Sequence, residues 1–578
     1  MFRLLKMMKA YRLECVLAPL FKMLEAFFEL FVPLVVADII DNGIKTGDKP
    51  YIFSRALIMA ALAIVGLLCS VTAQYFSAKA AVGFSAKVRN RLFHHIGGFS
   101  YTETDRIGTP TLLARLSNDL NQVQTGVNLT LRLLLRSPFI VFGCMIMAFT
   151  IDVKSATVFA ITIPVLCVVV FGVMLINIPL YKKVQTRLDR VLGDTRENLT
   201  GVRVIRAFGL EDSERTRFDK ANREHTRMQR FVGSFSALMN PVTYVIVNFA
   251  VIALIYVGAW QVEGGAISQG DLVALYNYMT QILVELVKMA SLIISITKAV
   301  ACGNRIQAVF DMPTEDLNAV EAPQSDVGHE TTALCFDHVS FRYAGASETS
   351  LSDISFSLEK GQTLGIIGGT GSGKTSVVHL IPRFYDAESG EISVNGKNIR
   401  AYSLSELRAM VGIVPQKAVL FHGTIRSNLL LGNEEATEEE LWVALEAAQA
   451  ADFVRTKDGG LDAVVEQNGK NFSGGQRQRL TIARALVRKP QILILDDSSS
   501  ALDYATDAKL RKAIASLTYH PTVVLVSQRT AALSAADAIL VLEDGESVGY
   551  GTHEELLKSC ETYAEIHYSQ FERKEDAE

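Results

Sequence analysis

The sequence contains few cysteines, and no two of them form a C-x-x-C pair. Seven cysteines are scattered among 578 residues, and an odd number excludes a framework in which every cysteine is disulfide-bonded. We expect them to be buried as small apolar side chains. They are Cys15, Cys69, Cys144, Cys167, Cys302, Cys335 and Cys560.

A large excess of charge of either sign is also absent. The formal net charge is −4 at pH 7, which gives no indication of a nucleic-acid partner. The mean hydropathy is nevertheless positive, +0.23, although 20% of the residues are charged. Soluble enzymes rarely have the first property, and membrane helix bundles rarely have the second. Together the two properties predict one membrane part and one soluble part.

The N-terminal segment MFRLLKMMKAYR lacks the short apolar core and the small-residue cleavage site of a removable signal peptide. It is basic and amphipathic, so we expect a helix that lies at the inner membrane surface. Beyond it, six apolar stretches are each near or above the roughly 20 residues that cross a bilayer. Several continue as a helical pattern, so we expect these helices to project into the cytosol. The predicted spans are 16–41, 54–80, 130–151, 154–181, 238–262 and 271–300.

Basic residues gather in the segments on one side of the predicted spans. The connections on the other side are short: 261–271 contains no Lys or Arg, and 152–154 contains only Lys154. By the positive-inside rule, we expect both termini in the cytosol. The basic residues on the cytosolic side include Arg3, Lys6, Lys9 and Arg12, then Lys87, Arg89, Arg91, Arg106 and Arg115, then Lys182, Lys183, Arg187, Arg203, Arg206, Arg227 and Arg230.

Some ionisable residues lie inside predicted spans: Glu25 and Glu29 in the first, and Glu285 and Lys288 in the sixth. Such residues usually face a bundle interior or a watery path. Glu25 and Glu29 are four residues apart and share one helix face. Two interpretations stay open: a cavity that receives polar or cationic substrates, or ion pairing between helices and positions near the membrane edge.

Residues 312–330, MPTEDLNAVEAPQSDVGHE, are acidic and poor in apolar residues, which is typical of a linker. After them, short β-rich runs alternate with helical ones, as in an α/β domain. We therefore predict a membrane domain at 1–311, a linker at 312–330 and an α/β domain at 331–578.

The α/β part contains GGTGSGKT at 368–375, which satisfies G-x-x-x-x-G-K-[ST] and follows the apolar run TLGII. The glycines of such a loop let backbone N–H groups surround phosphate oxygens, and the helix that follows adds its positive end. Lys374 is expected to pair with the β- and γ-phosphates of ATP, and Thr375 to bind Mg²⁺. The predicted nucleotide-binding residues are Gly368, Gly369, Thr370, Gly371, Ser372, Gly373, Lys374, Thr375 and Ser376.

Two further motifs follow the P-loop. QILILDD at 491–497 predicts a buried strand that ends in Asp496, which can bind the Mg²⁺ shell. FSGGQRQRL lies at 472–480 and resembles the signature sequence of ABC transporters. With six spans ahead of it, nearly the whole chain resembles an ABC exporter half-transporter: an all-α six-helix membrane domain and an α/β P-loop cassette. The matching order is Tyr343, the P-loop, Gln416 in VPQ, SGGQ, Asp496 and SALD at 500–503.

The resemblance implies a role for each motif. Tyr343 would stack on adenine, and Gln416 would approach Mg²⁺, which makes Thr375, Gln416 and Asp496 the implied metal-binding residues. Asp503 would cross the interface between two cassettes that meet head to tail, so a chain with one cassette must dimerise. The residues implied to contact the γ-phosphate of ATP on the opposite subunit are Ser473, Gly474 and Gly475, and Gln476 of the same motif is also expected to bind nucleotide.

Two segments between spans resemble the intracellular loops of this family, which end in coupling helices that touch the ATPase domains. They are GTPTLLARLSNDLNQVQ at 108–124 and ENLTGVRVIRAFGLEDSERTRF at 197–218. Their spacing alone indicates only amphipathic helices, so solvated helix extensions remain the alternative.

The sequence departs from the family at two catalytic positions. Asp497 stands where the family normally has Glu, which withdraws the carboxylate by about 1.5 Å, and a misplacement of about 1 Å can cost around a hundredfold in rate. Gln528 stands where the family usually has His, and its neutral amide cannot become cationic. A third, weaker departure is the run Val465-Glu466-Gln467-Asn468-Gly469, which lacks a common Arg.

The paired changes at Asp497 and Gln528 resemble the degenerate subunit of bacterial heterodimeric multidrug exporters. In that case this chain's ATP site would hydrolyse poorly, and its SGGQ would complete the competent site of a second half-transporter. A homodimer with neutral substitutions is the alternative. We expect an ATP-driven exporter of amphipathic drugs or lipids in the bilayer of a bacterial cytoplasmic membrane. The other candidates are a lipid or peptide exporter, an exporter-fold importer, and a regulatory ATP-binding subunit that gates a partner.

Overall fold

The structure is a computed structural model, and it describes residues 2–318, 320 and 331–571. Two compact units divide the chain: Met1–Ile96 with Pro110–Met312, and Gly97–Thr109 with Pro313–Glu578. The predicted linker at 312–330 falls mostly outside the described residues. Residues 97–109 were predicted within the membrane domain but group with the second unit.

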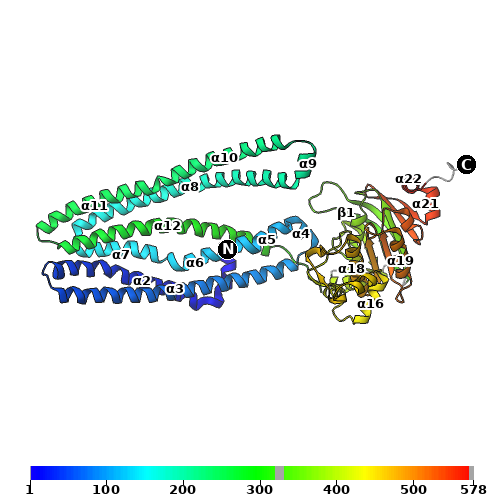
Figure 1. Cartoon of the computed structure of the whole chain (residues 1–578), viewed down its shortest axis with the longest axis horizontal. Helices are drawn as coiled ribbons and strands as arrows, with labels where there is room; N and C mark the ends of the chain where they lie inside the picture. The colour runs from blue at the N-terminus through cyan, green and yellow to red at the C-terminus, as the bar shows by residue number, and fades with distance from the viewer. Residues whose placement is uncertain (1, 319, 321–330, 572–578) are drawn as a thin grey trace. The chain divides into compact units, whose positions relative to one another are not determined.

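The regular elements described in the first unit are helices, and several are far longer than a bilayer requires (Figure 1). The helices α3 and α8 contain 49 and 48 residues, which is roughly 70 Å at a rise near 1.5 Å per residue. The hydrocarbon core of a bilayer is only about 30 Å thick. The elements are α1 (Phe2–Leu5), η1 (Lys6–Tyr11), α2 (Arg12–Asp38), η2 (Ile39–Ile44), α3 (Lys49–Gly97), α5 (Thr109–Ala114), η3 (Arg115–Asp119), α6 (Leu120–Leu133), α7 (Arg136–Ile151), α8 (Val153–Thr200), α9 (Val202–Ala207), α10 (Glu211–Ala237), α11 (Met239–Glu263) and α12 (Gln269–Phe310).

Among the described residues, the helical stretches long and apolar enough to cross a membrane number five, one fewer than predicted. They contain the predicted spans two to six. The predicted first span, 16–41, falls on α2, where Lys22, Glu25 and Glu29 interrupt the apolar sequence. The five stretches are Lys49–Gly97, Thr109–Ile151, Val153–Thr200, Glu211–Glu263 and Gln269–Phe310.

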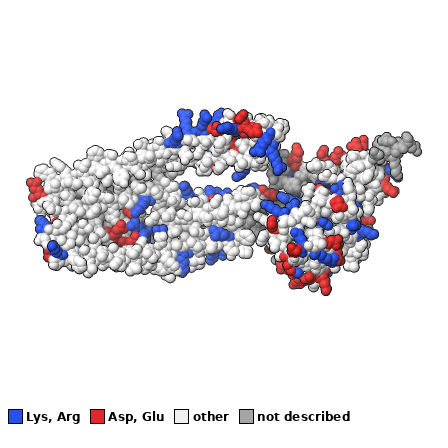
Figure 2. Space-filling model, in the orientation of Figure 1, with Lys and Arg blue, Asp and Glu red and all other residues white. Residues whose placement is uncertain are grey.

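The packing of the membrane unit centres on α12, which contacts α2, α6, α7 and α8. Tyr278 of α12 is fully buried, and its hydroxyl donates a hydrogen bond of 2.6 Å to the carbonyl oxygen of Leu30 in α2. A buried hydroxyl needs such a partner. Away from this core, Val168 and Phe249 are 73% and 69% exposed. The surface of the unit is mostly uncharged (Figure 2), as expected for helices in contact with lipid.

The second unit is an α/β structure with two main sheets. The larger sheet has the strand order β12-β11-β3-β10-β9-β6, with β12 antiparallel at its edge, and the smaller antiparallel sheet has the order β2-β1-β4-β5. The strands are β1 (Thr332–Phe341), β2 (Leu351–Glu359), β3 (Thr363–Gly368), β4 (Ser389–Val394), β5 (Lys397–Asn398), β6 (Val411–Val414), β7 (Gly423–Thr424), β8 (Val464–Val465), β9 (Ile492–Asp496), β10 (Thr522–Val526), β11 (Ala538–Glu543) and β12 (Glu546–Gly551). The helices are α4 (Tyr101–Ile107), α13 (Lys374–Leu380), η4 (Ile399–Ala401), α14 (Leu404–Met410), α15 (Ile425–Leu429), α16 (Glu438–Ala447), α17 (Ala451–Thr456), η5 (Gly460–Asp462), η6 (Gln467–Gly469), α18 (Gly474–Val487), α19 (Tyr504–Ala515), α20 (Thr530–Leu533), α21 (His553–Ser559) and α22 (Glu561–Tyr568).

The larger sheet separates two apolar cores. In β9, Ile492 and Ile494 pack toward the smaller sheet, whereas Leu493 and Leu495 pack toward the helices on the other face. This alternation follows from the two-residue period of a strand. Because both faces are covered, the central strands are continuous apolar runs. The prediction of a helical membrane part followed by an α/β part is therefore confirmed.

The short helix α4 packs within the second unit. The ring of Tyr101 stacks on Phe384 with centroids 4.4 Å apart, and Asp105 accepts a hydrogen bond of 2.6 Å from the hydroxyl of Tyr385. The segment 108–124, which resembles a loop that ends in a coupling helix, begins where this group of residues ends, at Thr109. Its contact with an ATPase domain stays a prediction. The second predicted segment, 197–218, contains the short helix α9, and its contact with an ATPase domain stays a prediction.

Candidate nucleotide-binding site

The predicted motifs of the second unit lie at one edge of its larger sheet. Gly368 ends β3 and Asp496 ends β9, while Gln528 follows β10 and Gln416 follows β6. These four strands are parallel neighbours in the order β3-β10-β9-β6. Their carboxyl ends therefore meet at the same edge, which is where open α/β sheets bind ligands.

Two glycines of the P-loop stand where any other residue would be strained. Gly373 has φ of +94°, and a Cβ atom there would lie 2.6 Å from Cδ2 of Leu351. At Gly368, with φ of +156°, a Cβ atom would lie 2.1 Å from the carbonyl oxygen of Leu542. This tight backbone leaves the N–H groups of the loop free to approach phosphate oxygens.

Lys374 lies at the first position of α13 and curls back over its own loop. Its Nζ atom donates to the carbonyl oxygens of Gly368 at 3.0 Å and Gly369 at 2.5 Å. Burial lowers the pKa of Lys374 from its ordinary value, and the charges of Asp497 and Asp496 oppose this shift. A partly desolvated ammonium of this kind gains more from an anionic partner than an exposed one does.

Two oxygen groups suited to Mg²⁺ face each other beneath the loop. The hydroxyl of Thr375 lies 3.3 Å and 3.5 Å from the two carboxylate oxygens of Asp496. Asp496 is 3% exposed, and burial raises its pKa, with a further contribution from the charge of Asp497. A buried carboxylate whose charge is costly is well matched to a divalent cation, and hydroxyl and carboxylate oxygens fit Mg²⁺ with phosphate and water as further ligands.

A cavity of about 920 Å³ opens beside the P-loop. Its size suits a nucleotide. Tyr343, the predicted adenine-stacking residue, lines it, and the hydroxyl of Tyr343 lies 3.0 Å from Oγ of Ser376. The residues fit ATP, which when bound would supply phosphate oxygens to Lys374 and to a Mg²⁺ ion held by Thr375 and Asp496. The lining includes Tyr343, Ser347, Thr349, Gly371, Gly373, Lys374, Thr375, Ser376, Asp544 and Gly545.

Asp497 is held by two contacts at this edge. Its backbone N–H donates to the carbonyl oxygen of Val526 at 3.1 Å, and its Oδ2 atom accepts a hydrogen bond of 3.3 Å from Nε2 of Gln416. Its φ is +44°, a left-handed conformation that Asp tolerates better than most residues. Gln416 was predicted at Mg²⁺ with Thr375 and Asp496. Its amide contacts Asp497, and its binding to Mg²⁺ stays a prediction.

The signature residues stand apart from this cavity. Ser473 caps α18. Its hydroxyl accepts a hydrogen bond of 3.3 Å from the backbone N–H of Gln476, and its own backbone N–H donates one of 3.1 Å to the side-chain oxygen of Gln476. A Cβ atom at Gly475 would lie 3.0 Å from the carbonyl oxygen of Ala501, so the signature helix begins beside the SALD segment. Gly474 has open space around it.

Asp503 of SALD caps another helix. Its carboxylate accepts hydrogen bonds from the N–H of Thr506 at 2.9 Å and from the hydroxyl of Thr506 at 2.8 Å, which begins α19. These hydrogen bonds lower the pKa of Asp503. The structure thus brings together the P-loop, Asp496, Asp497 and Gln416, whereas Ser473 and Asp503 do not line the P-loop cavity.

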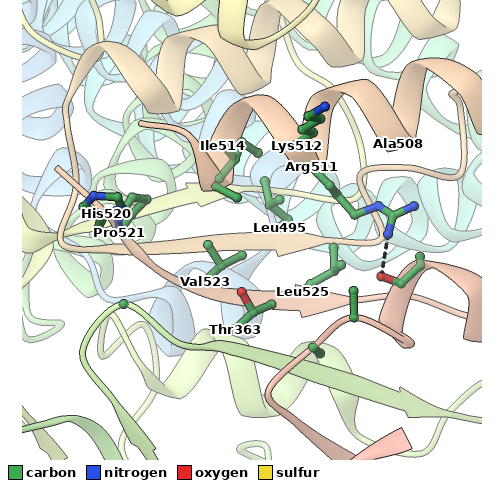
Figure 3. A pocket seen from close by; sticks show the side chains of 15 residues that line it. Thr363, Leu495, Ala508, Arg511, Lys512, Ile514, His520, Pro521, Val523 and Leu525 are labelled. Atoms are coloured by element: carbon green, nitrogen blue, oxygen red, sulfur yellow. Dashed lines mark hydrogen bonds between the residues drawn. The ribbon is translucent and has the colours of Figure 1, made fainter. Parts of the chain in front are cut away.

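A second cavity, of about 370 Å³, lies between α19 and the sheet (Figure 3). Leu495, Val523 and Leu525 form its floor. Arg511 of α19 reaches across it and donates a hydrogen bond of 3.1 Å to the carbonyl oxygen of Ala532 in α20. None of the predicted nucleotide-binding residues lines this cavity.

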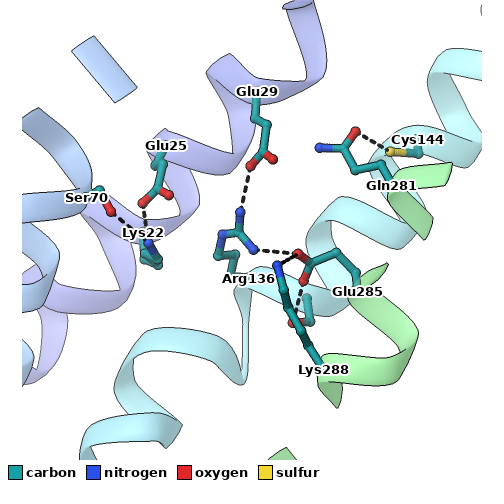
Figure 4. Close-up of polar contacts among 10 residues, drawn as sticks. Lys22, Glu25, Glu29, Ser70, Arg136, Cys144, Gln281, Glu285 and Lys288 are labelled. Atoms are coloured by element: carbon teal, nitrogen blue, oxygen red, sulfur yellow. Dashed lines mark hydrogen bonds and ion pairs between the residues drawn. The ribbon is translucent and has the colours of Figure 1, made fainter. Parts of the chain in front are cut away.

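The membrane unit contains a network of charged side chains (Figure 4). Arg136 at the start of α7 donates to Glu29 of α2 at 2.6 Å and to Glu285 of α12 at 2.7 Å. Lys288 contacts the same Glu285 oxygen at 2.9 Å, and Ser137 donates to the other oxygen at 2.8 Å. The side chains of Arg136 and Glu285 are only 8% and 2% exposed, so a buried ion pair joins α7 to α12, and the second pair of Arg136, with Glu29, joins α2 to them.

Glu25 is paired as well. Nζ of Lys22 lies 2.5 Å from its carboxylate, and the same ammonium donates to Oγ of Ser70 at 3.0 Å. Of the two interpretations that the sequence left open, the contacts of Arg136 with Glu29 and Glu285 support ion pairing between helices, whereas the pair of Lys22 and Glu25 lies within α2. Sequence reasoning missed Lys22 and Arg136, although each is a charged residue inside a predicted span and could have been found on that ground.

Comparisons with known proteins agree with this organisation. Residues 15–286 match the family described as "ABC transporter transmembrane region", and residues 351–500 match "ABC transporter". An uncharacterized ABC transporter ATP-binding protein of Mycobacterium tuberculosis (strain CDC 1551 / Oshkosh) is 36% identical over 565 residues, 97% of each chain. This chain belongs to the ABC transporters. It therefore joins an ATPase cassette to a membrane domain, and ABC exporters work as dimers in a lipid bilayer.

Two further similarities extend over nearly the whole chain. An ATP-dependent lipid A-core flippase of Vibrio parahaemolyticus is 27% identical over 576 residues, which is 98% of this ABC transporter and 97% of the relative. The structure of a bacterial Atm1-family ABC exporter with ATP bound superposes with a TM-score of 0.80 at 24% identity, over 97% of this chain and 99% of that chain. The latter confirms the predicted fold class, an exporter-type membrane domain fused to an α/β cassette.

Replacing Gly373 with alanine should lower the affinity for ATP by at least about tenfold, which corresponds to about 1.4 kcal/mol. A left-handed conformation alone costs a non-glycine residue roughly 1–2 kcal/mol, and the added Cβ would also collide with Leu351. The measurement is ATP photolabelling of the full-length transporter. Gly369→Ala is the matched control, since a Cβ atom at Gly369 meets no atom within 4 Å. Equal affinities for the two variants would contradict this account.

Removing Arg136 alone should destabilise the membrane unit more than removing its buried ion pair. Arg136→Met leaves the nearly inaccessible carboxylate of Glu285 without its main partner, which typically costs about 3–5 kcal/mol. The double variant Arg136→Met with Glu285→Met removes both charges and should recover most of this loss. Thermal unfolding of the purified transporter measures the difference. A double variant no more stable than Arg136→Met would show that the ion pair is not what stabilises this contact.

Proposed function

We propose that this chain is one subunit of a heterodimeric ABC exporter, and that its own ATP site holds MgATP but hydrolyses it slowly. The observation that carries the proposal is the pair Asp497 and Gln528 at the carboxyl edge of the sheet, where the family normally has Glu and His. The residues that bind nucleotide are retained, while those that act on water are changed. The domain boundaries at 1–311, 312–330 and 331–578 and the nucleotide roles of the motif residues form part of the same proposal.

The geometry supports a slow site. A carboxylate that activates water must reach it, and the shorter side chain of Asp497 is drawn to Gln416 by a hydrogen bond of 3.3 Å. Compared with Glu, the side chain of Asp497 reaches about 1.5 Å less far. A misplacement of about 1 Å can already reduce the rate a hundredfold. By contrast, Lys374, Thr375 and Asp496 form a complete set of groups for phosphate and Mg²⁺.

The intact signature supports the second half of the proposal. In the resemblance to ABC exporters, Ser473, Gly474 and Gly475 act on ATP that the opposite subunit holds, and here they lie outside this chain's own cavity. A partner with Glu and His at the two altered positions would thus have a competent site completed by this chain. A homodimer would instead have the changed pair in both sites.

We propose that the substrates are amphipathic drugs or lipids that leave the cytosol or the inner leaflet of a bacterial cytoplasmic membrane. The apolar spans support this, and a relative described as a lipid A-core flippase makes lipids a concrete candidate. Attraction of cations by free carboxylates receives no support, because Glu25, Glu29 and Glu285 each contact a basic side chain. Orientation with both termini in the cytosol remains part of the proposal.

Two alternatives predict different behaviour. A lipid or peptide exporter, or an exporter-fold importer, would move another solute or move it inward. A regulatory subunit that only gates a partner would bind ATP without movement of a solute. ATP-dependent movement of a labelled amphiphile in inverted vesicles separates these cases.

Substitutions in the two motifs of this chain should have unequal effects on ATP hydrolysis. Ser473→Arg puts a bulky cation where the signature closes over ATP of the competent site, so steady-state ATPase activity should nearly vanish. Asp497→Asn acts at the slow site and should cost much less. Each variant is co-purified with the wild-type partner. Ser473→Ala is the comparison variant: it removes the helix cap, worth about 1 kcal/mol, and the hydroxyl that would contact the γ-phosphate, but it adds no cation, so it should cost less than Ser473→Arg.

The outcome separates the two assemblies. In a homodimer, both substitutions would damage both sites, and both losses would be severe. If Asp497→Asn abolished turnover as fully as Ser473→Arg, this chain could not contain the slow site.

A further inference from the structure

The segment after β10 enters a very short helix that lacks a cap of its own. The helix α20 comprises Thr530–Leu533, and its N-cap residue, Arg529, makes no side-chain capping hydrogen bond. The first N–H groups of a helix find no acceptor within the helix itself. The acceptor for Thr530 comes from far along the chain.

Gln570 supplies this acceptor and a donor together. Its Oε1 atom accepts a hydrogen bond from the N–H of Thr530 at 3.0 Å and lies 3.3 Å from the hydroxyl of Thr530. Its Nε2 atom donates to the backbone carbonyl oxygen of Gln528 at 2.7 Å. One amide group thus bridges the backbone on both sides of Arg529.

The C-terminal helix α22 fixes the place of Gln570. Tyr563 of this helix is fully buried, and its hydroxyl lies 2.7 Å from Nδ1 of His553. His567, one turn before Gln570, contacts the hydroxyl of Thr530 through Nδ1 at 3.1 Å. The N–H of Gln570 donates to the carbonyl oxygen of His567 at 3.0 Å, so the amide emerges from an anchored helix end.

The other side of the same segment is tied to SALD. Arg529 donates to the carbonyl oxygen of Leu502 at 3.4 Å, and its guanidinium lies 4.6 Å from the ring centre of Tyr504. The end of α20 is held by Arg511 of α19, through the hydrogen bond to Ala532 drawn in Figure 3. Residues 528–530 therefore lie between the C-terminal helix and the helix that begins at Asp503.

We propose that Gln570 is a positioning residue for the ATP site, and that α22 belongs to the nucleotide-responsive part of this cassette. By fixing the backbone of Gln528, the amide limits the directions in which the side chain of Gln528 can extend. The strand beside β10 in the sheet, β9, leads to Asp497, whose N–H donates to the carbonyl oxygen of Val526 just before this segment. The inference rests on the ATP site of the proposed function and adds a residue that none of its motifs contains.

Loss of the bridge should weaken ATP binding because residues 528–530 would have more conformations to lose when the nucleotide binds. Gln570→Ala removes both hydrogen bonds to the backbone, so the affinity should fall roughly 3- to 10-fold, which corresponds to about 0.7–1.4 kcal/mol. Gln570→Glu keeps an acceptor for Thr530 but loses the donor to Gln528, so it should show a smaller loss.

The experiment uses the full-length chain with its partner in lipid vesicles and photolabelling by 8-azido-ATP, read on this chain alone. Ser569→Ala is the matched control, since within the described part of the chain its hydroxyl donates to the carbonyl oxygen of Ile566, at 2.8 Å, and not to residues 528–530. Unfolding temperatures of all variants are measured beside the affinities. The proposal expects the order Ser569→Ala equal to wild type, Gln570→Glu weaker and Gln570→Ala weakest, with unfolding temperatures nearly unchanged.

Wild-type affinity in Gln570→Ala would overturn the proposal. So would an equal loss in all three variants, or a loss that follows the unfolding temperature, because either would indicate a general role of the C-terminus in folding. The reading is taken on this chain whether its partner is the same or different. Equal hydrolysis at two sites would therefore refute the heterodimer and leave the role of Gln570 intact.

Discussion

The path of the backbone at the end of β3 is the constraint on which the nucleotide site depends. The loop from Gly368 to Lys374 can pass between Leu542 and Leu351 only because its glycines carry no side chain. Since β3 is a central strand, its parallel neighbours deliver Gln528, Asp496 and Gln416 to the same edge. The loop after β3 binds phosphate, whereas the adjacent loops after β9 and β10 carry the residues expected to activate the attacking water. A change in the latter need not disturb phosphate binding.

In the membrane unit, the governing interaction is the pairing of charges within the bundle. Arg136 joins α2, α7 and α12 through Glu29 and Glu285. Ionised groups in apolar surroundings are costly unless they are paired, so this network fixes which helix faces meet. The three carboxylates, of Glu25, Glu29 and Glu285, are balanced by the basic groups of Lys22, Arg136 and Lys288. Substrate binding would therefore depend on the apolar walls of the bundle and not on electrostatic attraction of cations.

The parts that could be predicted from the sequence are those in which a motif of known chemistry directly follows a recognisable strand. The P-loop, Asp496 and the buried strands could be placed because each motif follows a continuous apolar run. The partners of Glu29 and Glu285 could not, because Arg136 lies 107 and 149 residues away from them and helix periodicity does not fix which helices touch. Gln570 carries no motif at all. The packing of α4 could not be predicted either, because the stacking of Tyr101 on Phe384 joins residues far apart in the sequence.

The central claim is that the changed pair at Asp497 and Gln528 makes this chain's ATP site slow while the partner's site turns over. The most direct test is to load the assembled transporter with radiolabelled ATP, start turnover with excess unlabelled ATP, and follow the label on each chain. The account predicts that label bound at Lys374 of this chain outlasts many turnovers at the other site. Loss of label from both chains at the same rate would contradict it.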